Sequence, residues 1–477
     1  MTALEVGNDE VCREPSPGEA RTVVSQALRR TSKPTSSAAR PLAVRPVDKR
    51  HQVVILGGGF GGLQAAQSLK NTPVDVTLVD RRNFHLFQPL LYQVATGWLS
   101  PANIASTLRT VLRAQKDARV LLAEATDIDV NNRHVILGAD KISYDTLIVA
   151  TGSRHHYFGN EQWESLAPGL KTIEDAIEIR RRIFLAFEAA EREGSSERGR
   201  GHLTFIIVGG GPTGVELAGA LADIVNDTLT NDFRRINRPD VQILLVEVAD
   251  RILTAYPLEL SKKAESFLNQ EGVSVKNNST VTAIDESGVI IKHGEVTERI
   301  PCRTVLWAAG VRASFLGTVL ARQTGAKLDR SGRLLVEPDL SLTGHPEIFV
   351  IGDLGNYLHQ TNQPLPGTAP VAIQQGRYVA RLLSKRIAGK TMPPFHYRDR
   401  GNMAIVGRGT GVADLRRIHI AGFWAWLAWL FVHLINLVVF ENRVLVLIQW
   451  GWYYFRRDRA ARLITGDRYS DKRAGTY

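Results

Sequence analysis

Cysteine is nearly absent from this chain, because Cys12 and Cys302 are the only two among 477 residues. They provide no CxxC pair, no four-ligand zinc cluster and no iron–sulfur ligation. A disulfide-stapled fold is therefore excluded, and no metal site is expected. Any redox chemistry in this protein has to come from a bound organic cofactor.

Acidic residues are also fewer than basic ones: 48 Asp and Glu against 59 Lys and Arg give a net charge of +11. A basic balance favours an anionic partner such as lipid headgroups, nucleic acid or phosphorylated ligands, and composition does not choose among them. With 44% hydrophobic residues, the chain is large enough for two or three domains with substantial cores.

The first 48 residues lack an apolar run and are rich in Arg, Ser, Thr and Pro. Such a segment cannot bury enough surface to offset the entropy of ordering, which predicts a disordered basic tail over residues 1–48. Without an apolar core it is no secretory signal, and an organelle-type targeting sequence is the alternative. We therefore expect the catalytic body on the cytoplasmic side.

From His51 onward, short β-branched runs that end in glycine alternate with Ala- and Leu-rich stretches. This alternation is typical of βαβ units around a parallel sheet and predicts an α/β fold. Buried strands are expected at residues 52–58, 74–80, 146–152, 204–210, 241–247, 303–310 and 347–353.

Two of these strands open a turn of the form G-x-G-x-x-G. The first glycine of such a turn permits the tight bend, the second admits a pyrophosphate to the backbone, and the third lets the helix pack on the strand. The pattern predicts two dinucleotide sites, and glycine turns that merely pack a doubly wound domain are the alternative. The six glycines are Gly57, Gly59, Gly62, Gly209, Gly211 and Gly214.

A carboxylate ends the second strand of each unit, Asp80 in the first and Glu247 in the second. Each is expected to accept hydrogen bonds from ribose hydroxyls. The carboxylate of Glu247 would repel a 2′-phosphate, and the next residues, Val248 and Ala249, carry no positive charge to offset this. This arrangement favours NADH over NADPH as the nucleotide. Arg251 is a nearby basic residue, so NADPH remains the alternative.

Residues 50–390 resemble the two-dinucleotide-binding-domain flavoprotein reductases, in which one fold binds FAD and an inserted fold binds NAD(P)H. The resemblance implies an FAD-binding domain from residues 49–165 and 318–392, and an NADH-binding domain from residues 166–317. It also implies cofactor contacts at the two crossings between the domains and at a late FAD motif. The residues concerned are Thr151, Gly152, Gly310, Gly352 and Asp353.

A narrower resemblance comes from residues 83–97, residues 209–219 and the aromatic tail from Phe423. These segments resemble the type II NADH:quinone oxidoreductases, single-subunit respiratory dehydrogenases that pump no protons. Disulfide reductases and sulfide:quinone reductases of the same superfamily need reactive cysteines, which this chain lacks.

The narrower resemblance also implies roles for single residues. Pro89 and Leu90 would lie near the isoalloxazine and Glu216 beside the nicotinamide. Glu174 would be the carboxylate linked to proton delivery at the quinone. From the residues alone, Glu174 is equally a first-turn helix carboxylate stabilised by the helix dipole, and Glu216 a helix-surface residue.

The chain departs from the family at the quinone-site motif A-Q-x-A-x-Q, where residues 369–374 carry Pro370 in place of the first glutamine. Proline removes a side-chain donor and a backbone N–H. Gln374 therefore remains as the expected quinone contact.

Residues 393–477 are expected to form a membrane-anchoring domain. Residues 420–440 carry no charge and, as one helix, would be long enough to span a bilayer. His433 and Asn436 within this run, and the Trp- and Tyr-rich run after it, favour two helices lying in one leaflet with arginines near anionic lipid. A transmembrane helix, a buried helix pair and a homodimer interface are the alternatives.

The combined expectation is a membrane-attached enzyme that transfers hydride from NADH to FAD and two electrons to a membrane quinone, menaquinone or ubiquinone. No nucleic acid partner is expected. A soluble FAD-dependent NADH reductase of a ferredoxin or rubredoxin is one alternative, and a nonenzymatic NADH-sensing flavoprotein is another. A soluble reductase does not need the aromatic tail.

Overall fold

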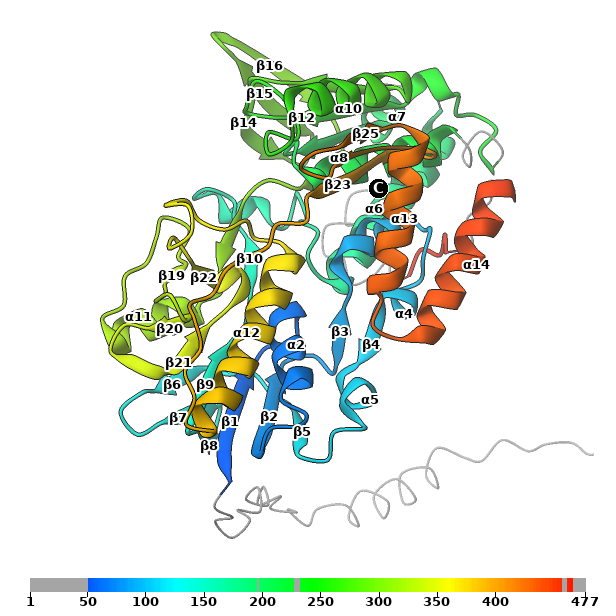
Figure 1. Cartoon of the computed structure of the whole chain (residues 1–477). Helices are drawn as coiled ribbons and strands as arrows, with labels where there is room; N and C mark the ends of the chain where they lie inside the picture. Colours follow the sequence, from blue (N-terminus) through cyan, green and yellow to red (C-terminus); the bar gives the residue numbers. More distant parts are fainter. Residues whose placement is uncertain (1–49, 195–196, 227–231, 457–460, 466–477) are drawn as a thin grey trace, which may run out of the picture. The chain divides into compact units, whose positions relative to one another are not determined.

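The computed structural model describes residues 50–194, 197–226, 232–456 and 461–465 (Figure 1). The basic tail predicted for residues 1–48 lies outside the described residues. The described part contains two open sheets with helices packed on them, together with a C-terminal segment of three strands and two helices. The predicted α/β class, with two Rossmann-like units and C-terminal helices, is confirmed.

The first sheet has six strands in the order β20-β21-β9-β1-β2-β5. All neighbours are parallel except β20 and β21, and the inner strands are apolar and buried because helices cover the sheet. The strands are β1 His51–Leu56, β2 Val74–Asp80, β5 Ala118–Leu122, β9 Thr146–Val149, β20 Ser341–Leu342 and β21 His345–Val350. Helices of this unit are α2 Phe60–Ser68, α5 Leu108–Leu112, α11 Leu316–Thr324 and α12 Ala369–Ile387.

The second sheet has four parallel strands in the order β13-β12-β11-β17. Its strands are β11 Thr204–Val208, β12 Gln242–Val246, β13 Val273–Lys276 and β17 Thr304–Trp307. The helices are α6 Ile173–Glu193, α8 Pro212–Ile224 and α10 Leu258–Gln270. An antiparallel sheet of β14 Ser279–Asp285, β15 Gly288–His293 and β16 Val296–Pro301 extends this unit.

The chain crosses between the two units twice, and the crossings lie side by side. β10 Ser153–His155 pairs antiparallel with β18 Val311–Ala313. Gly152 and Gly310, the residues just before these strands, both have φ of +67°. Smaller sheets decorate the first unit: β3 Phe84–Leu86 with β4 Ala105–Thr107, β19 Leu334–Leu335 with β22 Gly355–Asn356, and β6 Asp127–Asp129, β7 His134–Leu137 and β8 Asp140–Ser143.

The C-terminal segment begins with an antiparallel sheet of β23 Asn402–Gly407, β24 Thr410–Asp414 and β25 His419–Ala421. It ends in α13 Phe423–Asn436 and α14 Phe440–Arg456, with a break at Leu437. The uncharged run of residues 420–440 is therefore divided between a strand end and two helices. Among the described residues, no helix is both long and apolar enough to cross a membrane.

Packing ties this C-terminal segment to the second unit. Trp429 and Trp450 belong to the same hydrophobic core as Phe205 of β11 and Leu217 of α8. At Gly219 of α8, an added Cβ would lie 1.7 Å from the carbonyl oxygen of Val406 in β23. The segment therefore completes the core of the second unit instead of packing as a separate domain.

Replacing Gly219 with Ala should destabilise the protein, because the β23 backbone blocks the added methyl group. Overpacking of this kind costs about 1–3 kcal/mol or more. The matched control is Gly451→Ala in α14, where a Cβ meets nothing within 4 Å. This control should be neutral or stabilising by up to about 1 kcal/mol. Urea unfolding of both variants measures the difference, and equal midpoints would contradict the packing described.

Candidate active site

A cavity of about 590 Å³ lies where the carboxyl end of the first sheet meets the second unit. Its volume is in the range typical of cofactor sites. Ten of the predicted site residues line it: Gly57, Gly59, Asp80, Pro89, Thr151, Gly152, Glu216, Gly310, Gly352 and Asp353. The fold thus gathers residues that are about 300 positions apart in the sequence at one site.

The first glycine turn, between β1 and α2, leaves room for a ligand only at its tip. A Cβ at Gly62 would lie 1.9 Å from the carbonyl oxygen of Gly57, and Gly57 itself has φ of +102°. A Cβ at Gly59 would meet nothing within 4 Å. Gly59 caps the start of α2, where backbone N–H groups attract phosphate. The turn therefore fits the pyrophosphate of FAD.

The second turn, between β11 and α8, repeats this geometry. A Cβ at Gly214 would lie 1.8 Å from the carbonyl oxygen of Gly209, whose φ is +108°. At Gly211, which caps the start of α8, a Cβ meets nothing within 4 Å. These glycines do not line the large cavity, so the second turn offers a separate place for a second dinucleotide.

Asp80 and Glu247 hold their turns in the same way. Asp80 accepts hydrogen bonds from the N–H groups of Gly58 at 2.6 Å and Arg82 at 2.7 Å. Glu247 accepts from the N–H groups of Gly210 at 2.5 Å and Ala249 at 2.8 Å. A carboxylate has about four acceptor sites, so each retains capacity for ribose hydroxyls.

Lys171 is a cavity residue that the sequence did not single out. Its Nζ donates to Ser153 Oγ at 2.8 Å, Ser153 Oγ donates to Asp353 at 2.7 Å, and Nζ lies 3.8 Å from Asp353. Burial lowers the pKa of Lys171, and the charges of Asp353 and Asp175 oppose that change. Lys171 lies just before the start of α6, and nothing in the sequence around it indicates that its side chain points into the cavity.

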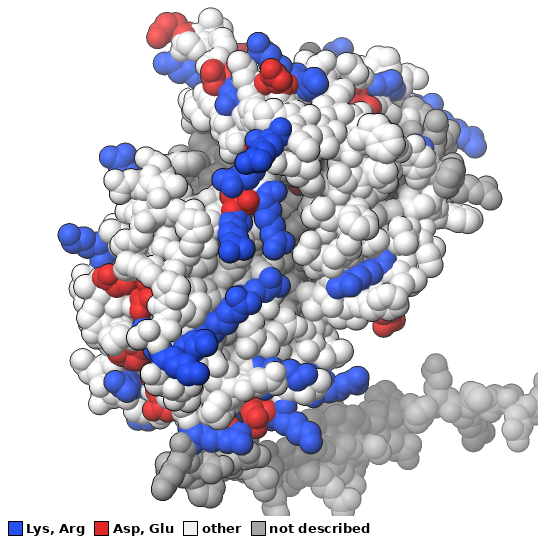
Figure 2. Space-filling model, in the orientation of Figure 1, with Lys and Arg blue, Asp and Glu red and all other residues white. Residues whose placement is uncertain are grey.

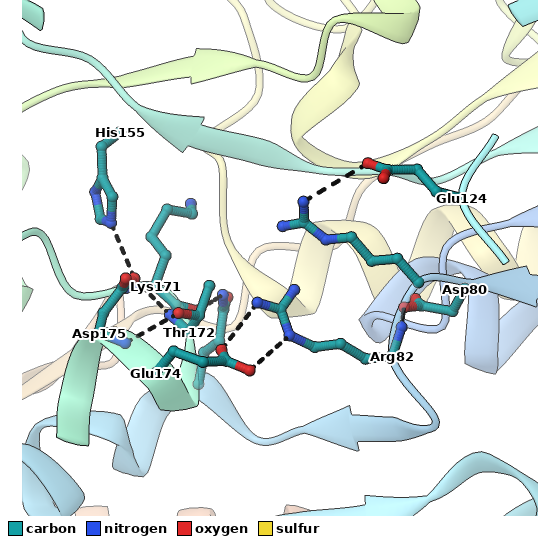
Figure 3. A network of polar contacts seen from close by, with 10 residues as sticks. Asp80, Arg82, Glu124, His155, Lys171, Thr172, Glu174 and Asp175 are labelled. Carbon is teal, nitrogen blue, oxygen red and sulfur yellow. Dashed lines mark hydrogen bonds and ion pairs between the residues drawn. The ribbon is translucent and has the colours of Figure 1, made fainter. Parts of the chain in front are cut away.

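Glu174 lies outside the cavity lining, in the first turn of α6. Thr172 caps this helix and forms a capping box with Asp175, which also contacts His155 (Figure 3). Glu174 pairs with Arg82 at 2.9 Å and its side chain is 62% exposed. Partial burial raises the pKa of Glu174, but the larger combined effect of Arg82 and nearby hydrogen bonds lowers this pKa below its usual value. The carboxyl group is therefore ionised. This position agrees with the first-turn helix interpretation.

Gln374 and Leu90 also lie away from the cavity lining. The amide of Gln374 donates to the carbonyl oxygen of Arg398 at 2.9 Å and accepts from its N–H at 3.0 Å. Leu90 is fully buried in the core of the second unit. The next residue along α12, Gln375, is buried and accepts from the N–H of Gly352 at 2.6 Å. Ala372 lines the cavity, and residues three positions apart lie on the same face of a helix. Gln375, and not Gln374, therefore lies on the side of α12 that faces the cavity.

Glu216 points inward from α8, so it is not a helix-surface residue. It lines the cavity near Thr213 and Tyr92. Burial raises the pKa of Glu216 to about 8, while the backbone of Ile405 and the side chain of Trp429 oppose the rise.

Comparison with known proteins first gives the class. The family model described as pyridine nucleotide-disulphide oxidoreductase matches residues 51–376. The chain is therefore a flavoprotein reductase of this class.

Curated relatives give the narrower family. The chain is 44% identical to the type II NADH:quinone oxidoreductase NdhA of Mycobacterium tuberculosis, over 90% of this chain and 92% of that protein. It is 42% identical to the enzyme Ndh of the same organism, over 90% and 93%. The chain belongs to the type II NADH:quinone oxidoreductases, as the sequence resemblance predicted.

A solved structure agrees at the level of the fold. NDH2 from Plasmodium falciparum in complex with NADH has a TM-score of 0.79 and 21% identity, over 87% of this chain and 100% of that chain.

The two glycine turns allow a reciprocal test. Gly59→Val and Gly211→Val both place a side chain in open space at ordinary φ, so both variants should fold. Gly59→Val should purify without flavin absorbance, whereas Gly211→Val should retain FAD and bind NADH at least tenfold more weakly, because each side chain occupies its own pyrophosphate space. Absorbance spectra and NADH titration measure both effects. Full FAD content in Gly59→Val would contradict the assignment of the two turns.

Proposed function

We propose that this chain oxidises NADH with bound FAD and passes two electrons to a membrane quinone, menaquinone or ubiquinone. The observation that carries the proposal is the pair of matching dinucleotide turns, the first at the large cavity and the second beside it, in a chain of this family. When bound, FAD accepts the hydride and supplies the electrons for the quinone.

The chain itself contributes orientation and electrostatics. The N–H groups at the start of α2 would hold the pyrophosphate of FAD, Asp80 would accept from its ribose, and Lys171 and Asp353 would provide further polar contacts in the same cavity. The first sheet with its helices is the FAD-binding unit, and the second is the NADH-binding unit. Residues from both units line the cavity and would hold the two cofactors in a fixed mutual orientation, which favours hydride transfer.

Nucleotide choice follows from the residues around Glu247. Arg251 is committed to the backbone, because its guanidinium donates to the carbonyl oxygens of Leu253, Thr254 and Tyr256. It is therefore a poor partner for a 2′-phosphate, whereas Glu247 suits the hydroxyls of NADH.

The NADH-to-NADPH ratio of kcat/KM should be large and should narrow in Glu247→Gln. The glutamine keeps an acceptor oxygen for the turn but loses the charged hydrogen bond to ribose, worth about 1.5–3 kcal/mol, or roughly tenfold to a hundredfold. Steady-state kinetics with both nucleotides measures the ratio, with the exposed Glu259→Gln on α10 as the control. Comparable wild-type rates with NADH and NADPH would contradict this role of Glu247.

Membrane attachment is proposed through the C-terminal helices. Each helix carries one exposed apolar stripe: Trp424, Leu427, Phe431 and Ile435 on α13, and Phe440, Val444, Leu447, Ile448 and Trp452 on α14. Figure 2 shows Lys and Arg in a band across the face on which α12 lies. Exposed basic residues of α12 and the following segments include Arg377, Arg381, Lys385, Arg398, Arg400, Arg416 and Arg417.

Together these features fit a monotopic protein whose helices lie in one leaflet of an anionic membrane, with the body on the cytoplasmic side. Aromatic residues settle at headgroup depth, and the basic band attracts anionic headgroups. The alternative is that a second copy of this chain covers the same stripes in a homodimer.

The double variant Trp424→Glu, Ile448→Glu should detach the protein from vesicles that contain anionic lipid. Each buried apolar side chain contributes about 1.5–3 kcal/mol, so binding should fall more than a hundredfold while NADH oxidation with a water-soluble acceptor stays near wild type. Vesicle flotation measures binding, and Val296→Glu, an equally exposed site on β16, is the control. If the double variant floats with vesicles as well as the wild type, and has a lower mass than the wild type by sedimentation without lipid, the apolar stripes form a dimer interface.

A further inference from the structure

His85 is a buried histidine directly behind the first glycine turn. It lies in the middle of β3, is 2% exposed, and is not among the residues that line the large cavity. Its Nδ1 lies 2.9 Å from the carbonyl oxygen of Gly58, and its ring meets the ring of Phe60 edge to face, with 5.0 Å between the ring centroids. His85 therefore contacts the turn without reaching the cavity.

The hydrogen bond to Gly58 fixes where the His85 ring carries its proton. A carbonyl oxygen only accepts hydrogen bonds, so Nδ1 is protonated and donates. Burial lowers the pKa of His85, although the Gly58 hydrogen bond and the charge of Asp80 oppose this, so the ring is neutral near neutral pH. Nε2 then carries no proton; it is buried and has no hydrogen-bond partner among the described residues. The Gly58 carbonyl is thus the group to which this ring is directed.

The peptide group between Gly58 and Gly59 needs such a support. Glycine has no Cβ, so with a glycine on each side the chain itself does not fix the plane of this peptide. Asp80 holds only the preceding peptide, through the N–H of Gly58. In a trans peptide the C=O and N–H bonds point in opposite directions. Because the Gly58 carbonyl points to His85, the Gly59 N–H points to the other side, where Gly59 lines the cavity.

The second turn also holds the matching carbonyl, but with a different group. Gly210 is the counterpart of Gly58, and its carbonyl oxygen accepts from the backbone N–H of Leu253 at 2.8 Å. Leu253 has φ of +50°, a left-handed conformation that residues with a side chain disfavour. The chain therefore adopts a strained conformation at the residue that holds this carbonyl. Two turns that hold the same carbonyl with unrelated donors indicate that its orientation matters for dinucleotide binding.

We propose that His85 is a positioning residue for FAD: by holding the Gly58 carbonyl, it directs the Gly59 N–H toward the pyrophosphate. This inference rests on the proposed binding of FAD at the first turn. Without the Nδ1 donor, the peptide between the two glycines can rotate and turn its carbonyl oxygen toward the cavity. A carbonyl oxygen repels the negatively charged phosphates, whereas an N–H group attracts them. Loss of the donor should therefore weaken FAD binding and leave the second turn unchanged.

Three substitutions separate the hydrogen bond from the packing of the ring. His85→Phe keeps an aromatic ring and removes the donor. His85→Asn loses the ring, but its amide nitrogen is bonded to Cγ as Nδ1 is, whereas His85→Gln carries this nitrogen one bond further out. FAD release should be about tenfold faster in His85→Phe and His85→Gln, and within about threefold of wild type in His85→Asn. Packing alone predicts the opposite order, with His85→Phe the mildest change and His85→Asn the most damaging.

Fluorescence of the freed flavin measures FAD release after the FAD-loaded protein is diluted. Phosphorus NMR of bound FAD gives a second signature, because the pyrophosphate resonances should shift in His85→Phe and return to their wild-type positions in His85→Asn. The matched control is His359→Phe, which removes a histidine donor to the Val336 carbonyl outside the cavity lining and should release FAD as wild type does. Wild-type release in His85→Phe, or release in His85→Asn as fast as in His85→Phe, would overturn the proposal.

A measurement on the wild type covers the case in which the His85 variants fail to fold. The FAD-loaded protein is labelled with ¹⁵N in histidine and with ¹³C in the glycine carbonyls. Solid-state NMR near neutral pH should then show a protonated Nδ1 coupled to a glycine carbonyl; an unprotonated Nδ1, or no such coupling, would overturn the proposal. These readouts do not depend on the quinone. Failure of the proposed function would appear separately, as a wild type that binds no FAD or has no NADH:quinone activity.

Discussion

The close approach of helix to strand at the two glycine turns is the constraint on which the rest of the site depends. In each turn the third glycine lies so near the carbonyl oxygen of the first that any side chain would collide with it. That approach points the first N–H groups of α2 toward the cavity and those of α8 toward the second site. Asp80 and Glu247 then fix the turns through two backbone hydrogen bonds each.

A second consequence follows from the paired crossings β10 and β18. Because these strands lie side by side, residues on both sheets reach one cavity, and a ligand there contacts both units. The C-terminal segment adds a third wall. Trp429 lies in the core with α8, so α13 turns its inner face toward the residues around Glu216 while its outer apolar stripe stays exposed.

Much of this arrangement could be predicted from the sequence because its signals are local. Glycine spacing, a strand-terminal acid and an uncharged aromatic run each have a physical meaning within a few residues. Gly57 lies in the turn after β1, and Asp80 and Glu247 lie where β2 and β12 end. The sequence did not show which face of a helix meets the cavity. Gln374 and Gln375 are adjacent, but only tertiary packing decides that Gln375 turns inward.

The same limit applies to charge. Glu174 and Glu216 are both helix glutamates in family motifs, and nothing local distinguishes their protonation. Arg82, distant in the sequence, keeps Glu174 ionised. The pKa of Glu216 is raised by desolvation, and the groups that oppose this rise are the backbone of Ile405 in β23 and the side chain of Trp429 in α13, from the far end of the chain. Through Trp429, α13 thereby acts on the acidity of a cavity residue. A change in the packing of α13 should therefore alter proton binding at Glu216 even where no substitution touches the cavity itself.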